Sequence, residues 1–316
     1  MKPIKIAVLM DDIKNIKPYK DSSLAMMLEA SRRNWEIYTF DAHDLFAQDG
    51  QVLATCAKTV VFDDTEHWYE QAPKEDLPLD NFNVILMRKD PPFDMNYIYA
   101  TYFLEQAENN GVLVVNKAQS LRDANEKLFA LNFPHCIAKT LVSSNKKRLK
   151  EFIKIQGVSV VKPLDGMGGK DIFKLERGDS NIDEVLDYIT HQGSTPIMAQ
   201  EFLPEIAQGD KRILLINGKP IDYALARMPA KGSFKGNLAA GATGIGQPLS
   251  ARDRYLCEQI APSLKSKGLM FVGLDVIGDY ITEINVTSPT CIRELDQQFN
   301  LNIAGVLFDE IQQALN

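Results

Sequence analysis

The sequence predicts an α/β fold, with a doubly wound N-terminal domain followed by a region of antiparallel strands. Apolar strand-like runs alternate with helix-like segments along most of the chain, which is typical of layered α/β proteins. Ile4–Met10 is a nearly continuous apolar run, as expected of a buried parallel strand. Farther along, Asn217-Gly218 separates two strand-like runs and is the strongest short hairpin signal in the chain.

The doubly wound pattern extends over residues 1 to about 120. After the first strand, Asp21-Ser22-Ser23 offers caps for a helix. The other expected elements are strands at Glu36–Phe40, Val84–Met87 and Val112–Asn116, and a helix after Asn96 that ends near Asn110-Gly111. Residues 41–81 have weak periodicity and many acids, so their pattern predicts no particular element.

The second region begins near Ser120 and also mixes helices with strands. Its expected helices are Asn125–Leu131, Lys146–Ile155, Ile182–Thr190, a segment from Ala251 to about Lys267 capped by Ser250, and a last helix capped by Asn302. Its expected strands are one near Thr140, Val158–Lys162, Ile197–Phe202, Lys211–Ile216, Pro220–Met228 and a hairpin nearer the C-terminus.

Composition excludes several classes of protein. The chain has 316 residues, of which 45% are hydrophobic and 24% charged, as in globular domains. A net charge of -7 disfavours nucleic acid as the main partner. The N-terminal apolar run is too short for a signal peptide, and no segment approaches a membrane span. The cysteines Cys56, Cys136, Cys257 and Cys291 form no paired metal motif, so we expect reduced thiols and a cytoplasmic protein.

The hairpin near the C-terminus carries a candidate magnesium site. Glu283 and Asn285 are two residues apart in an apolar strand, so both side chains point to one face. Asp275, in the preceding strand, lies across from Glu283 if three residues starting at Gly278 form the turn. A two-residue turn at Gly278-Asp279 would send the two carboxylates to opposite faces. In the alternative interpretation, Asp275 merely caps or solvates a hairpin.

Two carboxylates and an amide are hard oxygen ligands, but they are too few to enclose Mg²⁺. Water and nucleotide phosphate normally complete its octahedral shell. The missing ligands therefore suggest a bound nucleotide, whose phosphates other segments of the chain would bind.

A second signal is a strand that ends in Lys162 and runs into a glycine turn with Gly166, Gly168 and Gly169. Glycines let backbone N–H groups converge on phosphate oxygens, and the lysine supplies a point charge. A tight hairpin without a ligand is an equally good interpretation of this segment alone. Lys127, in an expected helix, means little by itself because helix lysines usually face solvent.

Three further segments fit a nucleotide site. The apolar strand Ala199–Phe202 can present backbone groups to adenine while Glu201 or Asp210 accepts from ribose hydroxyls, or it is an ordinary edge strand. Arg212 and Arg227 lie on the two arms of the Asn217-Gly218 hairpin, with Arg212 nearly opposite Tyr223 if pairing is direct. Their planar forks suit phosphates and oxyanions. The glycine-rich segment 227–246 is long enough for a lid, although disorder without function is the alternative.

Taken together, these segments resemble one family along nearly the whole chain. The matching stretches are Leu86–Asp94, Lys162–Gly169, Gly209–Arg212, Gly236–Gly241 and Thr282–Glu294. They look like bacterial glutathione synthetase, of the ATP-grasp superfamily. The resemblance implies a homo-oligomer, a tetramer by family, with an N-terminal Rossmann-like domain (1–121), a central lid subdomain (122–203) and a C-terminal ATP-grasp catalytic subdomain (204–316).

The resemblance also implies an activity and a set of roles. ATP, with Mg²⁺ or possibly Mn²⁺, would join γ-glutamylcysteine to glycine through an acyl phosphate. The implied nucleotide contacts are Lys127, Lys162, Gly166, Met167, Gly168, Gly169, Gln200, Glu201, Phe202, Leu203, Asp210 near the ribose, and Asn237 near the phosphates. The implied metal ligands are Asp275, Glu283 and Asn285. Arg212 and Arg227 would act in catalysis, and Arg88, Ser288 and Arg293 are candidates for the dipeptide.

Three other functions remain open at this stage. Another ATP-grasp ligase, joining D-alanine units or adding glutamate to a protein, would share the nucleotide site. A non-catalytic ATP-binding regulator of the same fold should have lost acids or arginines from the set, and this chain retains them. A Rossmann dehydrogenase is disfavoured because Met10-Asp11-Asp12-Ile13 stands where a glycine fingerprint would follow the first strand.

Overall fold

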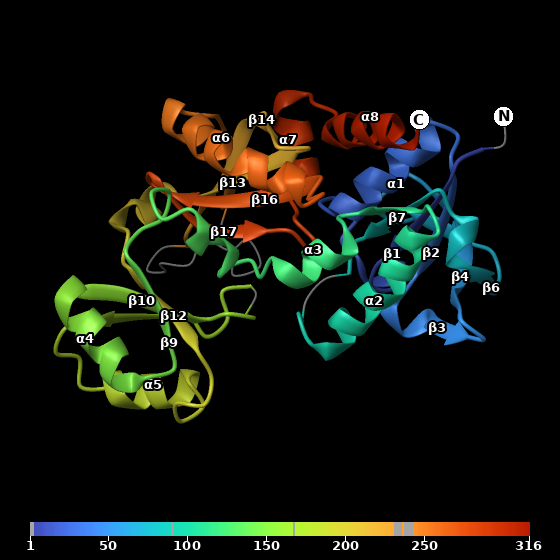
Figure 1. Cartoon of the computed structure of the whole chain (residues 1–316). Helices are drawn as coiled ribbons and strands as arrows, with labels where there is room; N and C mark the ends of the chain where they lie inside the picture. The colour runs from blue at the N-terminus through green and yellow to red at the C-terminus, as the bar shows by residue number, and fades with distance from the viewer. Residues whose placement is uncertain (1–2, 90–91, 167, 231–235, 237–242) are drawn as a thin grey trace.

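The computed structural model describes residues 3–89, 92–166, 168–230, 236 and 243–316. Three sheets organise the described chain (Figure 1). The N-terminal domain lies at one end of the molecule, and the other two sheets lie one above the other at the opposite end. None of the helices in the described part of the chain is both long and apolar enough to cross a membrane.

The N-terminal sheet has the predicted parallel centre. Its path is β3-β4-β2-β1-β7-β8, in which β1 pairs in parallel with β2 and β7, and β7 with β8. These elements are β1 (Lys5–Leu9), β2 (Glu36–Phe40), β7 (Val84–Met87), β8 (Leu113–Val115), α1 (Ser22–Arg32) and α2 (Met95–Asn109). The predicted cap is confirmed, because the Asp21 side chain accepts from the Leu24 N–H at 2.7 Å.

Residues 41–81 hold strands that the sequence pattern did not predict. They are β3 (Leu45–Gln48), β4 (Gln51–Val61), β5 (Tyr69–Gln71) and β6 (Glu75–Pro78), and they add an antiparallel extension to the sheet. Three of these strands are only three or four residues long, which is too short for a periodic signal.

The helix predicted at Asn125–Leu131 is wrong. After α3 (Ala118–Asp123) the chain turns, and only a short 3₁₀ helix, Phe129–Asn132, follows. The Asn125 side chain accepts hydrogen bonds from the N–H groups of Lys127 and Leu128, at 3.1 and 2.9 Å. Such local bonds compete with helical pairing. Lys127 therefore lies in a turn rather than on a solvent-facing helix.

The middle sheet is antiparallel, in the order β11-β10-β12-β9. It consists of β9 (Thr140–Ser143), β10 (Val158–Pro163), β11 (Phe173–Glu176) and β12 (Ile197–Glu201), packed with α4 (Lys146–Gln156) and α5 (Ile182–Ile189) (Figure 1). Leu149, Ile153, Val161 and Leu186 form a separate small core here, so the unit carries its own apolar interior.

The C-terminal sheet is also antiparallel, in the order β15-β14-β13-β16-β17. Its strands are β13 (Asp210–Ile216), β14 (Lys219–Met228), β15 (Thr243–Pro248), β16 (Phe271–Ile277) and β17 (Tyr280–Asn285). The helix α6 (Ala251–Ser266) packs with Ile213 and Leu215, whereas α7 (Ile292–Phe299) and α8 (Ile303–Leu315) pack with Leu214 and Ile216 on the opposite face. The predicted caps Ser250 and Asn302 are confirmed.

Two details of this sheet differ from prediction. Residues 243–246 belong to β15, which pairs with β14, so the end of the predicted lid segment is an edge strand. A register shift between Ile213 and Leu215 places Arg212 opposite Leu225 rather than Tyr223. The turn at Asn217-Gly218 is as predicted. The strands do not keep one continuous register beyond it, because of this shift.

The N-terminal domain is fastened to this sheet by a buried amide. The Asn116 side chain donates to the Phe271 and Val286 carbonyls, both at 2.7 Å, and accepts from the Phe271 N–H at 2.8 Å. Phe271 begins β16 and Val286 follows β17, so this amide holds the hairpin that carries Asp275 and Glu283.

Candidate functional site

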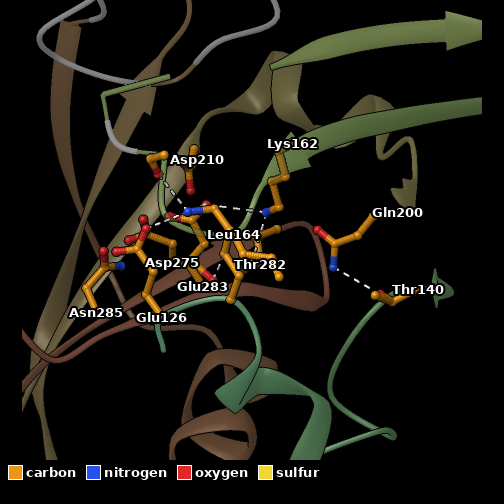
Figure 2. Close-up of polar contacts among 12 residues, drawn as sticks. Glu126, Thr140, Lys162, Leu164, Gln200, Asp210, Asp275, Thr282, Glu283 and Asn285 are labelled. Atoms are coloured by element: carbon orange, nitrogen blue, oxygen red, sulfur yellow. Dashed lines mark hydrogen bonds and ion pairs between the residues drawn. The ribbon is translucent and has the colours of Figure 1, made fainter. Parts of the chain in front are cut away.

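A cavity of about 250 Å³ lies between the middle and C-terminal sheets. Its lining brings together most of the residues that the sequence pointed to: Lys162, Gly166, Gly168, Gly169, Gln200, Glu201, Phe202, Leu203, Asp210, Arg212, Arg227, Asp275, Glu283, Asn285 and Ser288. These residues come from segments far apart in sequence, and they converge from both sheets (Figure 2). Met167 and Asn237, also predicted, lie outside the described residues.

The hairpin of β16 and β17 pairs Asp275 with Glu283, as predicted for a three-residue turn, but its turn is shorter. Its turn has two residues, Gly278-Asp279, with Ile277 opposite Tyr280. The expectation that a two-residue turn separates the carboxylates is wrong, because a register shift follows between Asp275 and Val276. Thr282 is the extra residue, and Asp275 ends opposite Glu283.

Arg212 and Arg227 both bind Asp275 in a buried cluster. Arg212 Nε and Nη2 donate to Asp275 Oδ1 and Oδ2 at 2.5 and 3.0 Å, and Arg227 Nη2 lies 2.9 Å from Oδ2. Burial by itself would raise the pKa of Asp275, but the charges and hydrogen bonds of the two arginines outweigh it and hold that pKa well below its usual range. Gly273 leaves room for this arrangement, since a Cβ there would lie 3.0 Å from Arg212 Cδ.

Two buried lysines converge on Glu283. Lys162 Nζ and Lys127 Nζ lie 3.3 and 3.7 Å from Glu283 Oε1. Burial would raise the pKa of Glu283, yet these lysines lower it. Lys127 also donates to the Gly166 carbonyl at 2.8 Å, although it is not among the cavity-lining residues. This contact ties Lys127 to the glycine turn, where Gly168 and Gly169 have φ of 66° and 76°.

Glu126 is a cavity residue that sequence reasoning missed. Its carboxylate forms an ion pair with Lys127, and its backbone carbonyl accepts from the Ile284 N–H at 2.8 Å. Burial raises the pKa of Glu126, and the negative charge of Glu283 adds to this effect. The sequence offered no signal for Glu126 beyond its place next to Lys127.

The proposed adenine segment forms one wall of the cavity. Gln200 donates to Thr140 Oγ1 at 3.0 Å, and the Lys174 ammonium lies 4.7 Å from the centre of the Phe202 ring. The N–H groups of Glu201 and Phe202 donate to chain carbonyls at 2.9 and 3.2 Å. Contacts to a base must therefore come from the other polar groups of this segment.

Asp210 lies beside the arginine cluster. It is the first residue of β13 and pairs with Arg227 across the ladder. Its Oδ2 accepts from Arg227 Nη2, while its backbone carbonyl lies 3.3 Å from Arg227 Nε.

The three dipeptide candidates lie near one another at the N-terminal domain. Arg88 donates to the Pro289 carbonyl at 2.8 Å and to Ser23 Oγ at 3.1 Å, and Ser288 Oγ donates to the Arg88 carbonyl at 3.3 Å. Of the three, only Ser288 lines the cavity. Arg293 forms an ion pair with Asp63 at 2.5 Å.

The charge pattern defines what the site can do. Four cations, Lys127, Lys162, Arg212 and Arg227, form ion pairs with four carboxylates, those of Glu126, Asp210, Asp275 and Glu283. Among the described residues, no group of three or more His, Cys, Asp or Glu side chains is placed to hold a metal ion. The predicted metal set has only two carboxylates and an amide, so it depends on ligands from substrate. The arrangement fits a site for a polyphosphate and a second anion.

Comparisons with known proteins agree with this geometry. Family models for the N-terminal domain and the ATP-grasp domain of prokaryotic glutathione synthetase match residues 4–122 and 126–300. Glutathione synthetase of Pseudomonas syringae pv. tomato is 54% identical over 312 residues, covering 99% of this chain and 98% of that protein. The Coxiella burnetii glutathione synthetase is 53% identical over 302 residues, covering 96% and 94%.

Solved structures give the same fold at lower identity. A D-cycloserine synthetase superposes with a TM-score of 0.70 at 14% identity, over 98% of this chain and 100% of that one. An ATP-grasp ligase with a minimal precursor has a TM-score of 0.64 at 17% identity, over 100% of both chains. The chain therefore belongs to the prokaryotic glutathione synthetase family, the ATP-grasp ligases that form glutathione with ATP.

Proposed function

We propose that this chain joins γ-glutamylcysteine to glycine, with ATP cleaved to ADP and phosphate, through an acyl phosphate. The observation that carries the proposal is one cavity lined by the predicted adenine segment, Lys162 and a buried arginine pair, with the buried Lys127 beside it on the Gly166 carbonyl. A carboxylate and an amine do not condense in water near neutrality. The carboxylate must first gain a leaving group, which the γ-phosphate of ATP supplies.

The cations reduce the electrostatic repulsion between the two anions that must react. Two unit charges at 4 Å interact by roughly 4 kcal/mol at an effective dielectric of about 20, so a carboxylate and a triphosphate repel each other strongly. Lys127, Lys162 and Arg212 offset this repulsion in the first step. In the second step, the amine attacks the acyl carbon, and Arg227 donates to the oxyanion that develops there.

The nucleotide is proposed to lie along the middle sheet. Lys127 and Lys162 contact its phosphates, together with the backbone of residues 166–169 and Asn237. Residues 200–203 hold the adenine. The glycine turn supports this placement, since Gly168 and Gly169 have no side chains to block an anion and their positive φ angles let the backbone turn its N–H groups toward it. Asp210, which the resemblance places near the ribose, lines the same cavity as this segment.

A divalent cation is proposed at Asp275, Glu283 and Asn285. The residues fit, because the bulge at Thr282 brings three hard oxygen groups to the cavity and leaves the rest of the shell to phosphate and water. Such a cation, Mg²⁺ with Mn²⁺ as a possible substitute, neutralises charge on the phosphates. Asp275 and Glu283 would exchange their arginine and lysine partners for it.

Replacement of Glu283 by glutamine is expected to weaken the dependence on divalent cation. The amide keeps the size of the side chain but removes the negative charge that a hard cation requires. Titration of ADP-dependent Mn²⁺ binding by electron paramagnetic resonance measures this directly, with Asp183→Asn, at an exposed ion pair on α5, as control. A variant that titrates like the parent would remove Glu283 from the ligand set.

The dipeptide is proposed to bind near Arg88, Ser288 and Arg293. Ser288 lines the cavity, and the Arg88 fork holds the Pro289 carbonyl of the same loop. This loop also carries Arg293 at the start of α7.

The wider organisation is proposed from the family resemblance. We infer a cytoplasmic homo-oligomer, a tetramer, built from units 1–121, 122–203 and 204–316. The four cysteines are buried and unpaired, which supports a reducing compartment. Light scattering of the full chain at several concentrations measures the oligomeric state.

Phosphate release is expected only when ATP, γ-glutamylcysteine and glycine are all present, apart from slow release without glycine as the acyl phosphate hydrolyses. Omitting each substrate in turn, with the D-alanine and glutamate acceptors in parallel, checks this. Faster phosphate release with ATP and D-alanine alone would exclude γ-glutamylcysteine and glycine as the preferred substrates.

A further inference from the structure

Lys211 belongs to the stretch Gly209–Arg212, which carries part of the family resemblance, but the mechanism above gives it no role. It is not among the residues that line the cavity. Adjacent side chains of a strand point to opposite faces, so Lys211 points away from Arg212 and toward α6. Its ammonium group forms an ion pair with Asp253 of α6 and donates to the Gly278 carbonyl at 3.2 Å. Lys211 therefore joins α6 to the turn of the hairpin that carries the proposed metal ligands.

The cap of α6 fixes the acid that binds Lys211. Asp253 is 1% exposed, and its Oδ2 accepts from the Ser250 N–H at 3.0 Å and from Ser250 Oγ at 2.7 Å. Its Oδ1 accepts from Lys211. A buried ion pair is often no more stabilising than apolar residues of the same volume, so stability alone does not explain a charge at this position. An ammonium group held in this way is suited to hold a backbone carbonyl in place.

A second cation holds the same turn. Arg252, in the first turn of α6, donates through Nε to the Asp279 carbonyl at 3.0 Å. Gly278 is also packed closely, since a Cβ there would lie 3.0 Å from Glu205 Cγ. Both residues of the turn are therefore bound by groups outside the hairpin.

The two ends of this hairpin have different registers. At the turn, the two-residue loop sets a register that, if continued, would place Asp275 opposite Thr282. At the open end, Asn285 lies opposite Gly273, and its side chain donates to the Gly273 carbonyl at 3.3 Å. The registers differ by one residue, and the bulge at Thr282 absorbs the difference. A free turn would take up the extra residue, and the bulge would disappear.

The bulge places two groups of the site. Thr282 Oγ1 donates to the Asp275 carbonyl at 3.3 Å, and the Thr282 carbonyl accepts from Lys162 Nζ at 3.3 Å (Figure 2). The same ammonium group lies 3.3 Å from Glu283 Oε1. Bulges bend a strand and change the direction of its side chains. Loss of this bulge would therefore shift both acids and Lys162.

We propose that Lys211 is a positioning residue for the metal site. Together with Arg252, it holds the Gly278-Asp279 turn at two residues and so keeps the bulge beside Asp275. Lys211 contacts neither cation nor substrate, and it acts through the backbone of the hairpin. This proposal rests on the divalent cation proposed above for that hairpin.

The test separates this role from stability by removing both members of the buried ion pair. Lys211→Met alone leaves Asp253 without its ion-pair partner and should destabilise the protein. Lys211→Met combined with Asp253→Asn removes that charge, so its urea unfolding midpoint should lie close to the parent value. ADP-dependent Mn²⁺ binding, followed by electron paramagnetic resonance, should still be weakened about 10-fold or more in the double variant, as for other groups that orient metal ligands.

Two controls accompany the double variant. Asp253→Asn alone keeps Lys211 on the Gly278 carbonyl and should bind Mn²⁺ more tightly than the double variant. Lys219→Met, at an exposed lysine of β14, should bind Mn²⁺ like the parent.

Two outcomes would overturn the proposal. Parent-like Mn²⁺ affinity in the double variant would mean that Lys211 acts in stability alone. Equal weakening in Asp253→Asn and in the double variant would assign the effect to the cap of α6. Failure of the proposed cation site is distinguishable, because the parent protein would then bind no Mn²⁺ with ADP.

Arg252→Ala provides a second variant, in case the double variant does not fold. It frees the Asp279 carbonyl from the surface and leaves the buried ion pair intact. Mn²⁺ binding with ADP should weaken severalfold. Binding like that of the parent would mean that the hold on this turn does not reach the metal ligands, which contradicts the proposal.

Discussion

Replacing Arg227 with alanine is expected to lower turnover by about 100-fold or more, the usual cost of losing one oxyanion donor. Arg227 is buried and lines the cavity together with Arg212. Its ion pairs with Asp210 and Asp275 fix the orientation of its side chain. Its loss should affect kcat more than the KM for ATP, because the oxyanion exists only after the nucleotide has bound and reacted.

Steady-state kinetics with circular dichroism as a check of folding measures this effect. Arg227→Lys adds a finer comparison, since a lysine keeps the charge but not the planar fork that two acids now hold. Arg254→Ala, at an exposed ion pair on α6, is the matched control. Parent-like turnover in Arg227→Ala would exclude Arg227 from the chemistry.

Replacing Asp275 with asparagine is expected to lower the free energy of unfolding by about 3–5 kcal/mol, besides abolishing activity. The two buried arginines would lose the carboxylate that both of them bind; Asp210 would keep its ion pair with Arg227, whereas Arg212 would lose the acid of its ion pair. An uncompensated buried charge costs more than the ion pair contributes.

This prediction also has a pH signature. The pKa of Asp275 is depressed in the folded protein, so its contribution to stability is present above its unfolded pKa of about 4. The contribution is lost as pH falls toward the folded value. Urea unfolding of parent, Asp275→Asn and Asp222→Asn at neutral and acid pH measures it. If Asp275→Asn matches the exposed control at neutral pH, the arginine cluster contributes no net stability.

Much of the fold and most of the chemistry could be predicted from local sequence. Caps such as Asp21 and Ser250, apolar runs such as Val84–Met87 and the Asn217-Gly218 turn are decided by residues within a few positions of one another. The failures arose where the local signal was weak or misleading. The short strands of residues 41–81 contain too few residues to show a hydrophobic period. Near Asn125, hydrogen bonds to its side chain formed in place of the first turn of the predicted helix.

The sequence by itself determined which chemical groups are present, their order along the chain and the family to which the chain belongs. Only the tertiary structure decided which groups meet. The bulge at Thr282 sets whether Asp275 faces Glu283, and the shift beyond Ile213 sets where Arg212 lies. Strand register depends on hydrogen bonds and packing summed over whole ladders, so no short segment encodes it.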